Sequence, residues 1–184
     1  MPRLMLLRHA KSSWSEEATA DFDRPLAPRG QKAAPLMGHY MKENGLLPDR
    51  VLCSSALRTR QTFAETLPFL AGEFDVLFLR AIYDTLDDDY LDIIREHGGD
   101  AATLLVIGHN PATHETALAL AGTGNTEDIA RLEGGFPTAA LAILDFEGAD
   151  WSGLKSGAGH LVSFIKPREL ETANGSDDGS ETAD

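Results

Sequence analysis

Arginine and histidine side chains stand at or just after the ends of three short apolar runs in the chain. Arg8 and His9 close the first run. Arg58 follows the second, and His109 follows the third, which spans residues 103–107. In an open α/β sheet the carboxyl ends of the strands meet along one crevice. If the runs are strands of such a sheet, two arginines and two histidines gather at one site.

Two arginines and two histidines at one site are suited to phosphoryl transfer. Guanidinium groups match phosphate oxygens and stay charged at any working pH. A neutral imidazole is a nucleophile near pH 7, and a second histidine can stabilise charge on the equatorial oxygens. Phosphoryl transfer depends mostly on positioning and electrostatic stabilisation, so we expect no cofactor and no metal.

The motifs around these residues resemble the histidine phosphatase superfamily. The superfamily's usual tripeptide is Arg-His-Gly, and this chain has Arg8-His9-Ala10, which is similar to the SixA-type phosphohistidine phosphatase branch. The resemblance runs from about Arg3 to Leu170. Further stretches that carry it are Asp23 to Leu26 with Arg29-Gly30, Ser54 to Thr62, Gly108 to Pro111, Phe136 to Thr138, and Trp151 onward to Pro167.

The resemblance implies a role for each of the four residues. His9 would accept the phosphoryl group and form a phosphohistidine intermediate, which water would hydrolyse. Arg8 and Arg58 would hold the phosphate, and His109 would complete the pocket. The substrate would be a phosphohistidine on a phosphorelay or phosphocarrier protein.

The residues beside the motifs either take part in the site or only shape its loops and helix ends. Lys11, Ser12 and Ser13 follow the nucleophile, and they either bind the substrate or only shape the loop. Asn110 is interpreted as a helix cap. Asp23 and Arg24 are interpreted as a charge pair that fixes a loop.

No motif fixes a carboxylate that could protonate a leaving group. Asp84, Asp87 and Asp88 lie in the region where such an acid would be expected. An alkoxide leaves poorly without a proton, whereas a phosphorylated imidazole has a weaker P–N bond and leaves more readily. The stretch between Leu79 and Thr103 is also too short to build a long lid. Both features favour a protein-borne phosphohistidine as substrate.

Three alternative functions stay open. A phosphomonoesterase for a small phosphorylated substrate would need a carboxylic acid near residues 84–88. A mutase-like phosphotransferase would need a closed pocket that excludes water. A non-catalytic module that binds phosphohistidine proteins would have no need of the nucleophile His9.

Apolar runs alternate with helical stretches, which predicts β-α-β units and a sheet with parallel strands. The fold class expected is α/β, a three-layer α/β/α sandwich with a mostly parallel central sheet, phosphoglycerate-mutase-like by the resemblance. Pro35 fits the first helix only if it lies near the first turn. Strands are expected at 3–7, 51–53, 74–79, 103–107, 139–146 and 161–165, with the last pair antiparallel. Helices are expected at 29–43, at 87–97 and at 112–120, the last of them preceded by Asn110-Pro111. A further helix is expected directly after Ser54 or Ser55, one of which would cap it.

The 184 residues are 42% hydrophobic, which suits one globular domain with a real core. Residues 1–170 are expected to form the histidine phosphatase domain. Residues 171–184 are expected to form an acidic and disordered tail, because its last part lacks apolar anchors. Nothing in the sequence demands more than a monomer.

The formal net charge is −13, with 29 acidic and 16 basic residues. A field of that sign disfavours nucleic acids and anionic membranes as partners. No run of about 18 apolar residues occurs, so no membrane span is expected. The single cysteine, Cys53, fits a reducing cytoplasm.

Overall fold

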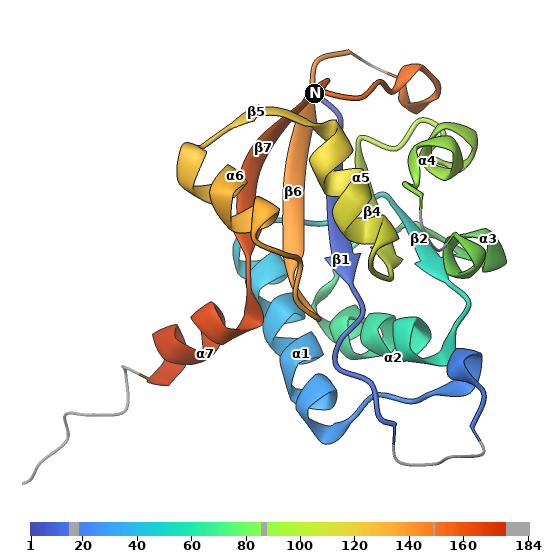
Figure 1. Ribbon diagram of the computed structural model, residues 1–184, viewed down its shortest axis with the longest axis vertical. Helices are drawn as coiled ribbons and strands as arrows, with labels where there is room; N and C mark the ends of the chain where they lie inside the picture. The colour runs from blue at the N-terminus through green and yellow to red at the C-terminus, as the bar shows by residue number, and fades with distance from the viewer. Residues whose placement is uncertain (15–18, 86–87, 149, 176–184) are drawn as a thin grey trace, which may run out of the picture.

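Seven strands form the centre of the protein in the computed structural model, which describes residues 1–14, 19–85, 88–148 and 150–175. They are β1 (Arg3–Arg8), β2 (Arg50–Ser54), β3 (Asp75–Leu79), β4 (Thr103–Gly108), β5 (Ala121–Gly124), β6 (Leu141–Phe146) and β7 (Gly159–Ile165). They form one sheet in the order β3-β2-β4-β1-β6-β7-β5 (Figure 1).

Most neighbouring strands in this sheet are parallel. β1, β2, β3 and β4 run in one direction, and β5 runs parallel to β7. β6 runs antiparallel to both β1 and β7. The predicted mostly parallel sheet and the predicted antiparallel final pair are therefore confirmed.

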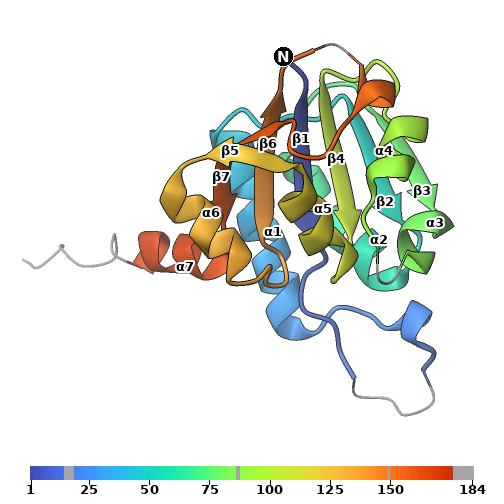
Figure 2. The ribbon, with the colours of Figure 1, turned by 45° about the horizontal axis from the view of Figure 1, so that its top comes forward.

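Helices cover both faces of the sheet and complete the predicted three layers (Figure 2). The helices are α1 (Pro28–Glu43), α2 (Leu57–Thr66), α3 (Arg80–Asp84), α4 (Leu91–His97), α5 (Ala112–Leu120), α6 (Thr126–Glu133) and α7 (Pro167–Gly175). α1, α2 and α7 lie on one face, and α3 to α6 lie on the other. Short 3-10 turns add Asp21–Asp23, Leu67–Phe69 and Trp151–Gly153.

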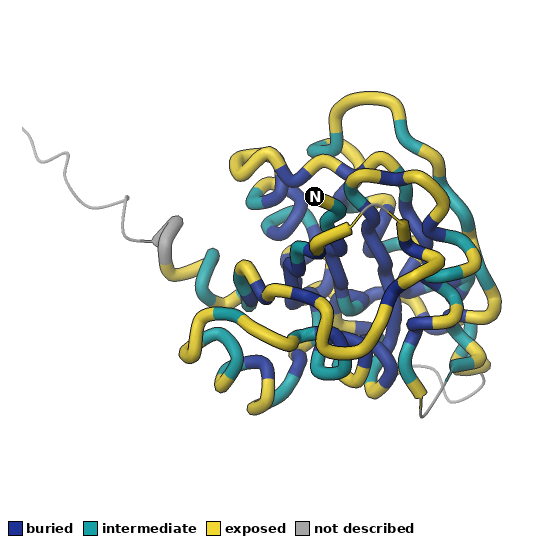
Figure 3. Tube along the Cα trace, turned by 90° about the horizontal axis from the view of Figure 1, so that it is seen from above, coloured by how far each residue is buried: buried dark blue, intermediate teal, exposed yellow. Residues whose placement is uncertain are grey.

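The central strand β1 divides the core between the two faces. Leu4 and Leu6 pack with the α3 to α6 side, whereas Met5 and Leu7 pack with the α1 side. Alternate side chains of a strand point to opposite faces, so a strand covered on both faces needs an unbroken apolar run. All four side chains are fully buried, and Figure 3 shows the buried segments in the interior of the molecule with exposed segments around them.

Helix α1 differs from the sequence-based expectation at Pro35. The helix begins at Pro28, so Pro35 lies in its interior rather than near its first turn. The missing N–H would have bonded the carbonyl of Gln31, which is an exposed residue where water can replace that bond. Gly45 follows the end of the helix with a φ of +64°, a left-handed conformation that favours glycine.

Two predicted helix caps are wrong. Ala56 is the cap residue of α2, where Ser54 or Ser55 was expected. Pro111 is the cap residue of α5 and follows a cis peptide bond, where Asn110 was expected. Ser54 and Asn110 do not cap these helices, because their side chains hydrogen-bond to other residues at the site described below.

Several short helices and one strand were not predicted from the apolar pattern, or were predicted with other bounds. α4 begins at Leu91 instead of residue 87, and α3 precedes it. β5 directly follows α5 and is itself followed by α6, in a segment where no strand or helix was predicted. α3 has five residues and β5 has four, so their sequences carry little periodic signal, whereas α6 has a clear helical periodicity that the prediction missed.

α7 continues past the expected domain boundary at residue 170, to Gly175. Residues 176–184, most of the expected disordered tail, lie outside the described residues. None of the helices described here has both the length and the apolar composition that a membrane crossing requires.

Candidate active site

A cavity of about 320 Å³ lies at the carboxyl ends of β1, β2 and β4. Six of the seven residues that the sequence offered for the site, all except Ser13, line it, although they come from three separate parts of the chain. These residues are Arg8, His9, Lys11, Ser12, Arg58 and His109. The cavity also contains residues that the sequence did not single out for the site, namely Trp14, Asp21, Arg24, Tyr83, Thr85, Asn110 and Thr138.

His9 is held in one tautomer by its own loop. Its Nδ1 lies 2.7 Å from the carbonyl oxygen of Ala10. A carbonyl only accepts hydrogen bonds, so Nδ1 carries the proton and Nε2 carries the lone pair. Burial lowers the pKa of His9 well below its ordinary value, so the ring is neutral near pH 7.

The loop after His9 is fixed by α2 and by the start of α1. The backbone N–H of Ala10 donates to Thr62 Oγ1 at 3.0 Å, and the N–H of Ala27 donates to the Lys11 carbonyl at 2.8 Å. Gly30 packs against this backbone so closely that a Cβ there would lie 2.2 Å from the Lys11 oxygen. The glycine is therefore needed for the close approach of helix and loop.

His109 faces His9 and is clamped at both its side chain and its backbone. The two ring centroids are 5.2 Å apart, and His109 Nε2 lies 2.7 Å from Ser54 Oγ. The buried Tyr90 hydroxyl accepts the His109 N–H at 3.0 Å and donates to the His109 carbonyl at 3.1 Å. Burial, with Arg58 nearby, lowers the pKa of His109 to about 3.

Arg8 is oriented by the loop before β6. Its Nη1 donates to the Phe136 carbonyl at 2.8 Å, and Asn110 Nδ2 donates to the same oxygen at 2.9 Å. The backbone N–H of Ala139 donates to the carbonyl oxygens of Arg8 and His9. Asn110 therefore supports the cavity wall and is not the predicted helix cap.

Asp21 joins Arg58 to two other side chains of the cavity. Arg58 donates to the Asp21 carbonyl at 2.7 Å and to Oδ2 at 3.2 Å. Arg24 Nε donates to Oδ1 at 3.0 Å, and the Tyr83 hydroxyl donates to Oδ2 at 3.0 Å. The predicted charge pair of Arg24 with Asp23 is therefore wrong, because Arg24 pairs with Asp21.

Asp21 is also the one carboxylate among the described residues that line the cavity. Burial alone would raise its pKa, but the Tyr83 hydrogen bond and the charges of Arg58 and Arg24 lower it below its ordinary value. Asp21 is thus ionised, and its carboxylate oxygens already accept hydrogen bonds from Arg58, Arg24 and Tyr83. It is poorly suited to donate a proton to a leaving group.

The three aspartates that the sequence offered as acids do not line the cavity in the described structure. Asp84 is exposed and pairs with Arg80 on α3. Asp88 is exposed, and its Oδ1 accepts the N–H of Asp89. Asp87 lies outside the described residues.

The buried nitrogens of the site favour an anion as ligand. Arg8 Nε, Arg58 Nε and His109 Nδ1 are buried without a hydrogen-bond partner in the described structure. Buried polar groups usually have partners, and guanidinium nitrogens only donate, so the two arginines are short of acceptors. The described residues form no group of three or more His, Cys, Asp or Glu side chains that could hold a metal ion.

Comparison with known proteins supports the same family. A model of the histidine phosphatase superfamily (branch 1) matches residues 4–76. A candidate phosphohistidine phosphatase SixA from Agrobacterium tumefaciens has a TM-score of 0.74 at 30% identity, over 90% of this chain and 97% of that one. This chain belongs to the histidine phosphatase superfamily.

Within the superfamily the protein is SixA-type. A second SixA candidate, from Nakamurella multipartitia, has a TM-score of 0.74 at 28% identity, over 90% of this chain and 96% of that one. An uncharacterized protein of Mycobacterium tuberculosis is 37% identical over 164 residues, which cover 88% of this chain and all of that protein. The phosphoglycerate-mutase-like fold class is confirmed by these likenesses.

The buried His109 predicts how the stability of this histidine phosphatase depends on pH. Its folded pKa of about 3 lies below the ordinary value of 6.5, so the unfolded chain binds a proton first as the pH falls. The stabilisation is complete above pH 6.5 and is lost from there down to the folded pKa, by about 1.4 kcal/mol per pH unit. We expect His109→Gln, which does not titrate, to lose less unfolding free energy than the wild type between pH 7 and pH 5.

Urea unfolding at the two pH values measures this difference, which we expect to be about 1–2 kcal/mol. His160→Gln is the matched control, because His160 is exposed. This control should lose as much unfolding free energy as the wild type. Equal losses in the His109→Gln and His160→Gln variants would contradict a buried, neutral His109.

Proposed function

We propose that this phosphatase hydrolyses phosphohistidine and that His9 carries the phosphoryl group between the two steps. The observation that carries the proposal is the tautomer of His9. Its Nδ1 is bonded to the Ala10 carbonyl, which leaves the Nε2 lone pair for the reaction in a cavity with two guanidinium groups. A neutral nucleophile beside fixed positive charge is what phosphoryl transfer requires.

The first step exchanges one P–N bond for another. Arg8 and Arg58 pair with the non-bridging oxygens, and His9 Nε2 attacks phosphorus in line with the departing nitrogen. The P–N bond of the substrate breaks, and its electron pair stays on the departing imidazole. That imidazole leaves neutral when its other ring nitrogen carries a proton, just as Nδ1 of His9 does. Nucleophile and leaving group are the same chemical group, so no proton needs to be transferred.

The second step returns the enzyme to its starting state. A water oxygen attacks phosphorus, the bond to His9 Nε2 breaks, and its electron pair returns to the ring. Both protons of the water leave with the phosphate, and Nδ1 keeps its own. His109 lies beside His9 and, with the two arginines, stabilises charge on the phosphoryl oxygens.

The state of Asp21 supports phosphohistidine over a phosphate ester. An alkoxide leaving group needs a proton, and this ionised carboxylate, bonded by Arg58 and Tyr83, does not supply one. An imidazole leaving group needs no proton from the enzyme when its other ring nitrogen already carries one. We infer that the natural substrate is a protein-borne phosphohistidine on a phosphorelay or phosphocarrier protein. Lys11 and Ser12 line the cavity as substrate-binding residues in this proposal.

The substrate class is tested by comparing kcat/KM for a phosphohistidine peptide, phosphoserine and 3-phosphoglycerate. We expect the phosphohistidine peptide to be preferred by about 10²-fold or more, which is the usual contribution of a general acid. His9→Ala should lose turnover of every substrate, and His160→Ala should retain it. A preference for either ester would support a small-molecule phosphomonoesterase instead, and turnover by His9→Ala would exclude His9 as nucleophile.

We also expect a loss of activity when Arg58 is replaced. Arg58→Ala removes a charged donor to the transferring phosphoryl group and should lower kcat/KM for the phosphohistidine peptide by about 10²–10³-fold. Arg60→Ala is the matched control, because Arg60 is exposed on the same helix and does not line the cavity. Similar activity in the two variants would show that Arg58 does not hold the phosphoryl group.

A further inference from the structure

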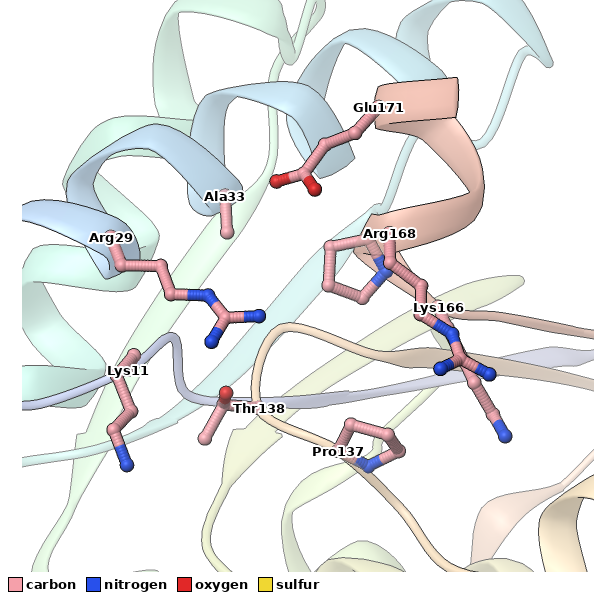
Figure 4. Close-up of a pocket in the computed structure, with 9 residues that line it drawn as sticks. Lys11, Arg29, Ala33, Pro137, Thr138, Lys166, Arg168 and Glu171 are labelled. Carbon is pink, nitrogen blue, oxygen red and sulfur yellow. The ribbon is translucent and has the colours of Figure 1, made fainter. Parts of the chain in front are cut away.

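A second cavity, of about 300 Å³, adjoins the active-site cavity and shares Lys11 and Thr138 with it. We call it the basic groove, after the four cationic side chains that line it: Lys11, Arg29, Lys166 and Arg168. Figure 4 shows Arg29 on one side of the opening and Lys166 with Arg168 on the other. The four come from the loop after β1, from α1, and from the junction of β7 with α7.

The four cations of the basic groove outnumber the one acidic residue among its lining residues, Glu171. Seven of the chain's sixteen lysines and arginines form ion pairs with aspartate or glutamate among the described residues. None of the four belongs to those pairs. The protein therefore concentrates unpaired positive charge beside its active site although its net charge is −13. Such a patch attracts anions over a distance and orients their approach.

The form of the groove suits a protein surface. Lys11, Arg29 and Arg168 are exposed, so their charged ends are accessible to a large partner. Between them Ala33 and Pro137 provide apolar lining that can contact side-chain carbons. Cations around apolar lining match a segment that carries both acidic and apolar residues.

We propose that the basic groove binds carboxylate side chains of the protein that presents the phosphohistidine to His9. The inference rests on the proposed function, because it places the acidic residues of that partner next to the transferred phosphoryl group. Since Lys11 and Thr138 line both cavities, one bound segment can occupy the groove while its phosphohistidine enters the active site. The groove thereby selects phosphohistidines that lie beside acidic residues.

Two phosphohistidine peptides of equal length test the proposal, one with acidic and one with neutral flanking residues, together with free phosphohistidine. The test variant is Arg29→Gln/Arg168→Gln, which leaves the lining of the active-site cavity intact. The control is Lys32→Gln/Lys155→Gln, which removes the same charge from exposed residues that do not line the groove. We measure kcat and KM at low and at physiological salt.

At low salt we expect the wild type and the control to prefer the acidic peptide by about tenfold in kcat/KM, mostly through KM. Exposed ion pairs each contribute about two- to fivefold, so the double variant should bring the two peptides within about twofold of each other. Glu171→Gln removes the acid that lines the groove and should increase the preference. Turnover of free phosphohistidine should be the same in all four proteins.

Several results would overturn the inference without touching the proposed function. One is a wild type that turns over both peptides equally, and another is a double variant that keeps the full preference. A double variant that also loses turnover of free phosphohistidine would place these arginines in the phosphoryl chemistry. With 3-phosphoglycerate as a further substrate, a double variant altered only on that substrate would assign the groove to a small organic anion. A wild type that hydrolyses none of the phosphohistidine substrates would instead refute the proposed function, and this inference with it.

Discussion

The hydrogen bond from His9 Nδ1 to the Ala10 carbonyl is the constraint on which the site depends. It is 2.7 Å long, and it decides which ring nitrogen carries the proton and which the lone pair. The bond is useful only while the Ala10 backbone stays in place, and Thr62 and the close approach of Gly30 to Lys11 hold that loop. The packing of α1 and α2 thus determines the chemical state of one imidazole.

The same burial that positions the histidines also keeps them uncharged. Two imidazoles with centroids 5.2 Å apart, beside Arg8 and Arg58, would repel each other and the arginines if protonated. Their low pKa values leave the guanidinium groups as the permanent charges of the site, with Asp21 to balance Arg58. The cavity is therefore cationic enough to hold a phosphoryl group and still contains a neutral imidazole, the form that the proposed nucleophile needs.

The strand ends could be predicted from the sequence because buried parallel strands leave unbroken apolar runs with polar residues directly after them. That pattern located His9, Arg58 and His109. Asp21 and Tyr90 could not be predicted in the same way. Asp21 meets Arg58 and Tyr83 across 37 and 62 positions of the chain, and nothing local distinguishes it from the other aspartates. The two helix caps were predicted wrongly for the same reason, because Ser54 and Asn110 form hydrogen bonds with residues far away in the sequence.

The most direct test of the account is to trap the phosphoryl enzyme. Wild type and His9→Ala are exposed briefly to phosphoramidate, kept at neutral pH and analysed by mass spectrometry with peptide mapping. We expect one added phosphoryl group on the wild type, mapped to His9, and none on the variant. A label on another residue, or phosphate released by His9→Ala, would contradict the claim that His9 Nε2 is the nucleophile.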